Sequence, residues 1–440
     1  MTSDPVIQLE IPFDAAIPGV SKAAQPDAML ALCREHLVDA PLEERSAWAR
    51  CMAMEAIYQP GRACRIAYEL HDENGDRPSI VYARWPAEGD RHASATRIRA
   101  HGGAFDLFRY PRDRRLRPIR EIRREDWLKE ASAAWFAEKW GSGRWSEDDW
   151  RCTPIKYVPE SRLVCRMKGL WKIAAGGEKW VRAYVRVSRI DTSADQVDTL
   201  SAVKEALFRA GMPFDTPSPL ASMPEYHLLA TDFIRGTTLR EQADAGNLDA
   251  VLDACRRIAR LSQLREMWSM KALAVPKPLP PAMLSDLAMA APALGMKVRA
   301  LTDWAHTLPP LPDVLRPIHG DLHTGQIIQK GSQLFLVDWD HAALGDPTAD
   351  ICNLSAELEF RQTVAGMGPP GIVAPELIDA WRGANGAFNP NSASWWFAYA
   401  CVRRAWGMLR HLRPSWNEGA ALLLNRAAEV LRNRVLVLGR

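Results

Sequence analysis

The chain has 440 residues, of which 56 are Lys or Arg and 53 are Asp or Glu, so its net charge is +3. This charge argues neither for nor against nucleic acid, and we expect no nucleic-acid partner. No apolar run of about 18 residues predicts a transmembrane helix, so no membrane is expected, and the first residues lack the basic and apolar regions of a signal peptide. The eight scattered cysteines show no zinc spacing, which favours free thiols and a cytoplasmic location.

The N-terminal part of the chain is predicted to begin with two helices. Apolar residues at helical spacing predict these helices over residues 26–37 and 41–58. The second helix is supported by the spacing of Trp48, Met52 and Ala56. A pair of strands around a Gly-containing turn is predicted to follow.

This strand pair has a pattern that occurs twice. Residues 58–85 and 157–187 each begin with Tyr-x-Pro, continue into a strand with a Cys-Arg pair, turn at Gly and end in a strand that carries an Arg. The final arginines are Arg84 and Arg186. We interpret the pattern as an internal duplication of a β-hairpin, and two unrelated hairpins are the alternative.

The first copy is predicted to serve structure or recognition rather than catalysis. Arg84 is followed by Trp85 and Pro86, and proline cannot donate a hydrogen bond within a sheet. Residues 87–103 are polar and do not predict a helix that would carry an acidic partner for Arg84.

An arginine-rich segment lies between the two copies. Residues 105–124 contain eight arginines. Two interpretations stay open, namely a patch for an anionic partner or a solvated face in which Asp113, Glu121 and Glu125 lie close to the arginines. A helix rich in Trp and Ala is predicted over residues 125–140.

The remaining chain divides into a short mixed segment and a long helical one. After the second hairpin, a helix is predicted over residues 194–210, followed by a strand over 226–234. Residues 237–440 are mostly helical. The predicted helices of this last part cover 248–261, 283–308, 351–362, 375–382, 392–412 and 417–431.

Residues 318–350 bring several acid-bearing segments around one short hairpin. The strands flanking the turn at 330–333 end at Gln326 on one side and at Asp338 on the other, so the hairpin brings these two residues together. Asp321 lies shortly before Gln326. Oxygen ligands of this kind suit a Mg²⁺ ion that carries phosphates.

The motifs of this stretch occur in a fixed order. They are His319-Gly320-Asp321, Gln326, Asp338-Trp339-Asp340, Gly345-Asp346-Pro347 and Asp350. The order resembles the catalytic segment of the aminoglycoside phosphotransferase and choline-kinase-like family, which consists of small-molecule relatives of the protein kinases. Gln326 stands where this family usually has Asn, and it offers the same amide carbonyl on a longer stem.

The resemblance implies an α+β fold of the bilobal, protein-kinase-like kind. Residues 156–236 would form the small N-lobe with its antiparallel sheet and hinge, and residues 237–440 the larger helical C-lobe. Residues 1–155 would then be an extra N-terminal α+β module that contains the first copy of the duplicated hairpin. The oligomeric state cannot be read from the sequence.

The resemblance also implies a small-molecule kinase that uses Mg²⁺ and ATP or GTP. Its acceptor would be a hydroxyl group of an aminoglycoside, another sugar or an amino alcohol. Asp321 would be the catalytic residue that orients this hydroxyl, and Gln326 and Asp338 would bind the metal. His319 and Asp340 would support the loop. Asp346 and Asp350 are expected to hold it by accepting hydrogen bonds from backbone amides.

The nucleotide site implied by the resemblance departs from the family pattern. Arg186 stands where the family has a phosphate-binding Lys, with Asp198 as its expected acidic partner. The hinge that holds the base would be Thr231, Asp232, Phe233 and Ile234. No Gly-rich phosphate loop is visible. These departures favour the alternative of a catalytically impaired protein that binds nucleotide or ligand, and transfer of AMP instead of phosphate also stays open.

Residues 394–406 are dense in aromatic side chains. A bundle core is one interpretation. The other is an acceptor pocket, since the resemblance implies that this helical region binds the second substrate. Trp395, Trp396 and Tyr399 are the candidate acceptor residues.

Overall fold

The computed structural model describes residues 9–73, 78–86, 96–116, 118–122, 125–264, 279–366 and 373–433. Contacts divide the chain into two compact units. The first holds residues 1–194, 220–231 and 408–416, and the second holds residues 195–219, 232–407 and 417–440. The boundaries at 155 and 236 stay a prediction.

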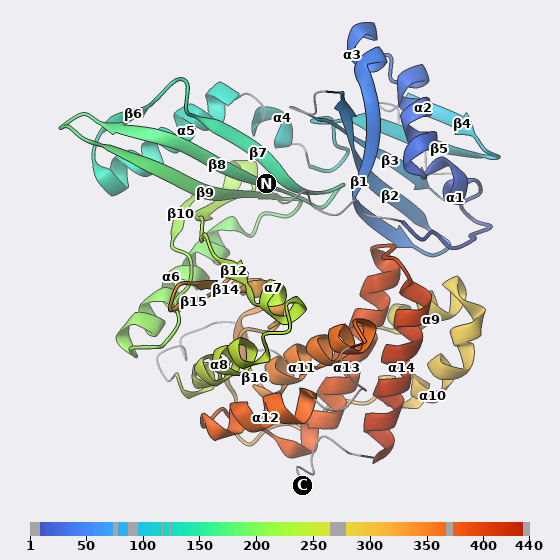
Figure 1. Cartoon of the computed structure of the whole chain (residues 1–440), viewed down its shortest axis with the longest axis vertical. Coiled ribbons are helices and arrows are strands. Elements are labelled where there is room, and N and C mark those ends of the chain that lie inside the picture. The colour runs from blue at the N-terminus through green and yellow to red at the C-terminus, as the bar shows by residue number, and fades with distance from the viewer. Residues whose placement is uncertain are drawn as a thin grey trace. The chain divides into compact units, whose positions relative to one another are not determined.

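The first unit contains two antiparallel sheets and several helices (Figure 1). Its helices are α1 (Val20–Ala23), α2 (Pro26–His36), α3 (Leu42–Ala47), α4 (Ile119–Ile122), α5 (Glu125–Trp140) and the 3₁₀ turn η1 (Pro224–Tyr226). Its strands are β1 (Trp48–Gln59), β2 (Ala63–Asp72), β3 (Ser79–Pro86), β4 (Thr96–Ala100), β5 (Gly103–Arg109), β6 (Gly143–Trp145), β7 (Arg151–Val158), β8 (Arg162–Ile173), β9 (Glu178–Ser188), β10 (Pro219–Met223) and β11 (Leu228–Asp232).

The first sheet has the strand order β1-β2-β3-β5-β4, and α2 packs beside β1 (Figure 1). The helix expected over residues 41–58 is wrong, because only 42–47 are helical and β1 begins at Trp48. Cys51, Ala53 and Glu55 are buried at every second position of β1, which is the period of a strand. Pairing with the long neighbouring strand β2 therefore outweighs the helical spacing of Trp48, Met52 and Ala56.

The second sheet has the order β10-β11-β9-β8-β6, and β7 also pairs with β8. The strands predicted within 58–85 and 157–187 are confirmed. In both copies a three-residue loop after Tyr-x joins two antiparallel strands, and the same backbone bond closes it, from Arg62 N to Gln59 O at 3.0 Å and from Ser161 N to Val158 O at 3.1 Å. This equivalence supports the duplication, which stays a prediction.

One continuous core joins the two sheets of the first unit. Tyr82 of the first sheet stacks on Phe108 with ring centres 4.5 Å apart, and meets Tyr157 of the second sheet edge to face at 6.1 Å. From α5, Phe136 packs edge to face on Trp145 at 5.2 Å. Such large rings bury extensive apolar surface and thereby contribute to the stability of this unit.

The arginine-rich segment pairs with carboxylates of its own unit. Arg109 contacts Glu44, Arg112 contacts Asp39 at 3.1 Å, and Arg114 contacts Glu160 at 3.2 Å. These contacts favour the interpretation in which the arginines have acidic neighbours. These acids are distant in sequence from the arginines, and the side chains of Glu121 and Glu125 lie outside the described part of the chain.

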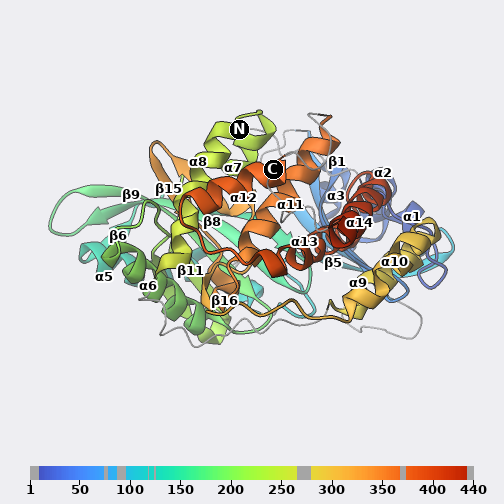
Figure 2. The ribbon, with the colours of Figure 1, turned by 90° about the horizontal axis from the view of Figure 1, so that it is seen from below.

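The second unit is mainly helical (Figures 1 and 2). Its helices are α6 (Ser193–Arg209), which begins in the first unit, α7 (Leu239–Asp244), α8 (Leu248–Ala259), α9 (Pro281–Ala290), α10 (Gly295–Ala305), α11 (Thr348–Val364), α12 (Val373–Gly383), α13 (Pro390–Arg410) and α14 (Trp416–Asn433), with 3₁₀ turns η2 (Arg260–Gln263), η4 (Pro292–Leu294), η5 (Thr324–Gln326) and η6 (Trp339–His341). Its strands are β12 (Thr237–Thr238), β13 (Arg316–Ile318), β14 (Ile327–Lys330), β15 (Gln333–Leu336) and β16 (Ala343–Gly345).

These elements confirm the α+β class, with antiparallel sheets and a large helical part. In both views α10 lies beside α14, and Lys297 Nζ donates to Asn425 Oδ1 between them at 2.8 Å. No helix among the described residues is long and apolar enough to cross a membrane.

The first prediction concerns the buried carboxylate of Asp113, which is only 3% exposed. It accepts hydrogen bonds from the backbone N of Arg115 and Leu116 at 2.7 and 2.9 Å, from Tyr157 Oη at 2.6 Å and from Glu160 N at 2.9 Å. Asp113→Asn replaces an acceptor oxygen by a donor, so we expect it to lower the free energy of unfolding of this unit by about 2–4 kcal/mol. Urea denaturation measures the loss.

Asp148→Asn is the matched control, because Asp148 is exposed. It should change the free energy of unfolding by no more than about 0.5 kcal/mol. Equal stabilities of the two variants would contradict the importance assigned to Asp113.

Candidate active site

Two short antiparallel strand pairs hold the loop formed by residues 319–326. Ile318 pairs with Ala343 at one end, and Ile327 pairs with Leu336 at the other. Both pairs are buried, because their apolar residues form part of the core of the second unit. The loop therefore begins and ends at fixed points.

The backbone of Val337 forms hydrogen bonds with two of the predicted site residues. Its N–H donates to Gln326 O at 3.0 Å, and its carbonyl lies 3.0 Å from His319 Nε2. The structure thus brings His319, Gln326 and the neighbouring Asp338 together, as the hairpin predicted. His319 is fully buried, with its ring 4.8 Å from that of Trp339.

Asp350, in the first turn of α11, holds the start of the loop. Its carboxylate accepts hydrogen bonds from His319 N at 2.7 Å and Gly320 N at 2.9 Å, which confirms the expected contact with backbone amides. Burial raises the pKa of Asp350, although His319 and these two donors oppose the shift. Gly320 has φ +81°, and a Cβ there would lie 2.1 Å from His341 O, so this position requires glycine.

Two further residues on the same face of α11 hold the rest of the loop. Asn353 Nδ2 donates to Leu322 O at 2.9 Å, and Glu357 accepts from Thr324 N at 2.7 Å. With Asp350 these residues follow the spacing of three and four that places side chains on one side of a helix. Helix α11 therefore fixes the backbone on both sides of Asp321.

Positive charge surrounds Glu357. Arg240 lies 3.3 Å from its carboxylate, and Arg404 donates to Asn353 O at 2.9 Å close by. Burial by itself would raise the pKa of Glu357, but Arg404, His323 and the bond from Thr324 N together lower this pKa to about 2. Glu357 therefore stays ionised.

His323 is held in its neutral form. Burial lowers the pKa of its ring to about 4, although the negative charges of Glu357 and Asp321 act to raise this pKa. The ring Nδ1 accepts a hydrogen bond from Gly325 N at 3.1 Å. His323 thus closes the short turn that leads to Gln326.

Asp321 is more accessible than the residues of this buried network. Its side chain is 22% exposed, and Arg403 Nη2 lies 3.1 Å from its Oδ1. Arg403 also lies over Tyr399, 6.0 Å from the ring centre, and Tyr399 stacks on Trp395 at 5.2 Å. The predicted acceptor aromatics are therefore connected to Asp321 through Arg403.

The three predicted acceptor residues differ in what they can offer. Trp395 is only 5% exposed and donates through Nε1 to Thr307 at 3.1 Å. It is thus a buried residue against which Tyr399 stacks. Trp396 is half-buried and donates to Asp346 at 3.1 Å. Tyr399 is half-buried and carries the contact with Arg403.

Gln326 and Asp338 have the chemistry that a Mg²⁺ ion needs. Gln326 is 5% exposed, and its Oε1 has no hydrogen-bond partner within the described part of the chain. Asp338 is exposed and adopts the left-handed conformation, with φ 67° and ψ 62°, which Asp tolerates better than most residues. A buried carbonyl oxygen without a partner beside a carboxylate fits a magnesium ion, since it takes one or two protein oxygens.

Larger metal clusters are not found in the described residues, because no three or more His, Cys, Asp and Glu side chains gather there to hold an ion. Asp340, the predicted supporting residue, is exposed and follows Asp338 in the turn η6. The candidate site is thus of the kind that leaves most metal positions to water and phosphate.

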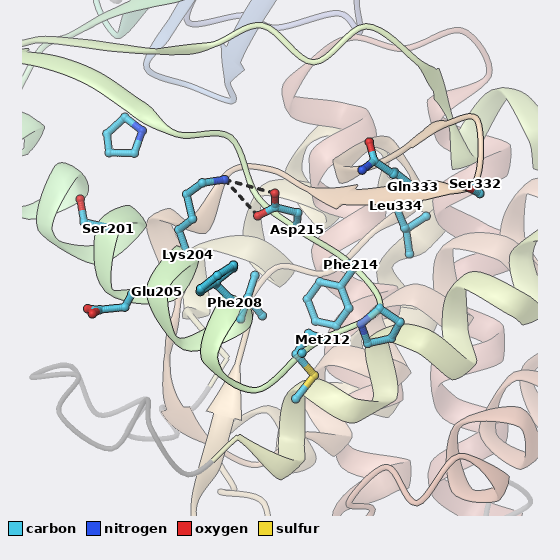
Figure 3. A pocket seen from close by; sticks show the side chains of 14 residues that line it. Ser201, Lys204, Glu205, Phe208, Met212, Phe214, Asp215, Ser332, Gln333 and Leu334 are labelled. Atoms are coloured by element: carbon cyan, nitrogen blue, oxygen red, sulfur yellow. Dashed lines mark hydrogen bonds and ion pairs between the residues drawn. The ribbon is translucent and has the colours of Figure 1, made fainter. Parts of the chain in front are cut away.

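The hairpin that carries Asp338 is braced by the segment after α6 (Figure 3). Asp215 N donates to Leu334 O at 2.8 Å, and Leu336 N donates to Asp215 O at 2.9 Å. Lys204 Nζ reaches the Asp215 carboxylate at 3.1 Å. A cavity of about 780 Å³ lies here, but Asp321, Gln326 and Asp338 are not among its lining residues.

The predicted nucleotide residues lie on three elements. Arg186 is on β9, where its backbone is paired with Val164. Thr231 and Asp232 end β11, and Phe233 and Ile234 follow them. Asp198 is exposed on α6. Their roles in nucleotide binding stay a prediction.

The sequence interpretation missed the residues that support the loop from α11, α13 and α7. These are Asn353, Glu357, Arg403, Arg404 and Arg240. Polar residues at 350, 353 and 357, which share one face of a helix, were one available signal. The pair Arg403-Arg404 within the aromatic helix was another.

Comparison with known proteins now decides the family. The model of the APH phosphotransferase enzyme family matches residues 172–396, which is just over half of the chain. The chain belongs to this family. It is therefore a phosphotransferase with a protein-kinase-like fold. The family suspected from the sequence is confirmed.

Solved structures with a similar chain path are distant in sequence. A macrolide 2′-phosphotransferase of Brachybacterium faecium shows 16% identity and a TM-score of 0.39, over 67% of this chain and 98% of its own. A choline/ethanolamine kinase family protein of Mesorhizobium loti shows 16% identity and a TM-score of 0.39, over 66% and 93%. An amicoumacin kinase, solved with AMP-PNP, Ca²⁺ and Ami, shows 12% identity and a TM-score of 0.45, over 70% and 96%. None of the curated proteins matches the chain.

The second prediction concerns pH. Because the pKa of His323 is lowered from 6.5 to about 4 in the folded chain, the unfolded chain binds more protons between these values, and stability must fall as pH falls from 6.5 towards 4. His323→Asn keeps an acceptor for Gly325 N but does not titrate. Between pH 7 and pH 5 the variant should therefore lose about 2 kcal/mol less stability than the unchanged chain.

Urea denaturation at the two pH values measures this difference. His306→Asn, which removes an exposed histidine, is the control and should follow the unchanged chain. If His323→Asn also follows it, the ring of His323 is not held neutral by the fold.

Proposed function

We propose that this phosphotransferase is a Mg²⁺-dependent kinase that moves the γ-phosphate of ATP, or of GTP, to a hydroxyl group of a small molecule. One observation carries the proposal. The accessible carboxylate of Asp321 stands on a loop that α11 holds on both sides, and the same loop ends at Gln326, whose buried oxygen has no partner among the described residues. A rigid carboxylate and a metal-binding oxygen on one loop are what phosphoryl transfer requires of the protein.

Asp321 would accept a hydrogen bond from the acceptor hydroxyl and direct its oxygen at the γ-phosphorus. A bond forms between this oxygen and the phosphorus, and the bond from the phosphorus to the bridging oxygen of the nucleotide breaks, so that ADP leaves. The hydroxyl proton passes to Asp321 and then to water. The loop contacts keep Asp321 in place, which lowers the entropic cost of the step.

Gln326 and Asp338 would hold the magnesium ion, with Asp340 supporting the turn. Bound there, the ion would neutralise charge on the nucleotide phosphates. Arg186 would pair with the phosphates and with Asp198, and residues 231–234 would hold the base. The eight cysteines are free thiols and seven are buried, which suits a cytoplasmic enzyme that uses ATP.

The third prediction tests nucleotide binding. A ligand at a hundred times its dissociation constant stabilises the folded chain by about 2.7 kcal/mol. Millimolar ATP or GTP with Mg²⁺ should therefore raise the melting temperature by several degrees. Asp338→Ala should remove the part of this rise that depends on Mg²⁺.

Asp379→Ala, which removes an exposed carboxylate on α12, is the matched control and should keep the full rise. An unchanged melting temperature in the presence of both nucleotides would remove the basis for a kinase. A rise that Asp338→Ala leaves intact would place the metal elsewhere.

The fourth prediction separates a working kinase from a protein that only binds nucleotide. Asp321→Asn should keep the thermal shift with Mg²⁺ and ATP but lower turnover about a hundredfold or more, because a positioned base contributes on that scale. Acceptor-dependent release of ADP measures turnover. Asp249→Asn, an exposed residue of α8, serves as the control, and full turnover of Asp321→Asn would refute the role of Asp321.

A further inference from the structure

Arg403 lies against the carboxylate that is proposed to orient the acceptor. Its Nη2 is 3.1 Å from Asp321 Oδ1, and the two side chains are 36% and 22% exposed. A pair that is open to solvent contributes little to folding, because water screens the attraction. Arg403 can therefore leave Asp321 for another anion at small cost to the fold.

The neighbouring Arg404 shows the contrast. It is half-buried and donates to the carbonyl and to the side chain of Asn353 at 2.9 and 3.2 Å. Its charge also lowers the pKa of Glu357. Arg404 thus serves the loop, whereas Arg403, one residue earlier on α13, faces Asp321 and the aromatic ring of Tyr399.

The other acidic residues near Asp321 are not available to bind an acceptor. Asp346, Asp350 and Glu357 are 5%, 2% and 3% exposed, and each accepts hydrogen bonds from groups of the protein. The guanidinium of Arg403 is the positive group that contacts Asp321 among the ion pairs of the described residues, whereas the exposed Arg240 contacts Glu357. An ammonium group entering here would meet repulsion from Arg403.

We infer that Arg403 selects an acceptor with a carboxylate a few bonds from its reactive hydroxyl, so that the substrate class is hydroxy acids rather than amines or aminoglycosides. This inference rests on the proposed function. A single guanidinium matches a single carboxylate, which it can bind through two parallel hydrogen bonds. The acceptor carboxylate would replace Asp321 as the partner of Arg403 Nη2.

In the reaction Arg403 turns to the acceptor carboxylate and releases Asp321 Oδ1. Asp321 then accepts the hydrogen bond of the acceptor hydroxyl. The hydroxyl oxygen bonds to the γ-phosphorus, the bond to the bridging oxygen breaks with departure of ADP, and the proton passes to Asp321. Tyr399, with Trp395 behind it, offers a flat apolar face to the carbon skeleton of the acid.

The test uses the full chain and sets of compounds that differ in one group. One set is gluconate, glucose and glucosamine, and the other is glycerate, glycerol and serinol. Calorimetry with Mg²⁺ and a non-hydrolysable ATP analogue measures binding, and ADP release measures turnover. In at least one set we expect the acid to bind at least tenfold more tightly than the neutral compound, and the amine to bind most weakly.

Variants at Arg403 connect this preference to the residue. Arg403→Gln should weaken binding of the acid about 10–100-fold, the range of a charged hydrogen bond, with the loss in KM rather than kcat. Arg403→Lys should restore part of it, because the charge stays but the planar fork is lost. Arg382→Gln, which removes an exposed guanidinium 5.9 Å from the Phe388 ring, is the control and should keep the preference.

Three outcomes overturn the inference: no acid of either set binds, an amine or neutral compound binds as tightly as its acid, or Arg403→Gln leaves acid binding unchanged. The thermal shift with Mg²⁺ and ATP separates this failure from failure of the proposed function. If the unchanged chain and Arg403→Gln both keep the shift, only the acceptor class is wrong. If the unchanged chain shows none, the kinase itself is wrong.

Discussion

The site depends on one constraint, which is that a loop buried on one side must satisfy its own backbone. Residues 319–326 form only a single 3₁₀ turn, so their amides and carbonyls need partners from elsewhere. Helix α11 supplies these partners through Asp350, Asn353 and Glu357. An unpaired buried amide would cost about 1–3 kcal/mol, so the position of α11 largely determines where Asp321 and Gln326 lie.

The charges of the site follow from this arrangement. Asp350 and Glu357 lie on one buried helix face, where their negative charges repel each other and lose contact with water. Each carboxylate therefore needs hydrogen-bond donors or positive charges beside it. Asp350 has two backbone donors, and burial still raises its pKa. Glu357 has Arg404 and Arg240, while His323 beside it stays neutral. Arg404 donates to Asn353, and its charge lowers the pKa of Glu357. The preceding residue on the helix, Arg403, is the one that faces Asp321.

Features of the fold and the site could be predicted where the interacting residues are close in sequence, and not where they are far apart. The hairpin that brings Gln326 to Asp338 is local, and the order of its motifs indicated both the family and the loop contact of Asp350. The helix expected through Trp48 failed because pairing with β2 outweighed local spacing. The partners of Arg109 and Arg403 lie 65 and 82 residues away, and a single sequence gives no signal for such pairs.

Gln326 shows why the departure from the family pattern matters physically. Its backbone is fixed by bonds from its N–H to His323 O and from Val337 N to its carbonyl, both at 3.0 Å. The longer stem of Gln therefore cannot be absorbed by a shift of the chain, and the amide oxygen ends in a buried position without a partner among the described residues. A buried acceptor without a partner lowers the free energy of unfolding by about 1–3 kcal/mol. Under the proposed function, a cation bound to Gln326 would supply the missing contact and recover this free energy, so the residue that lowers the stability of the fold would also strengthen cation binding.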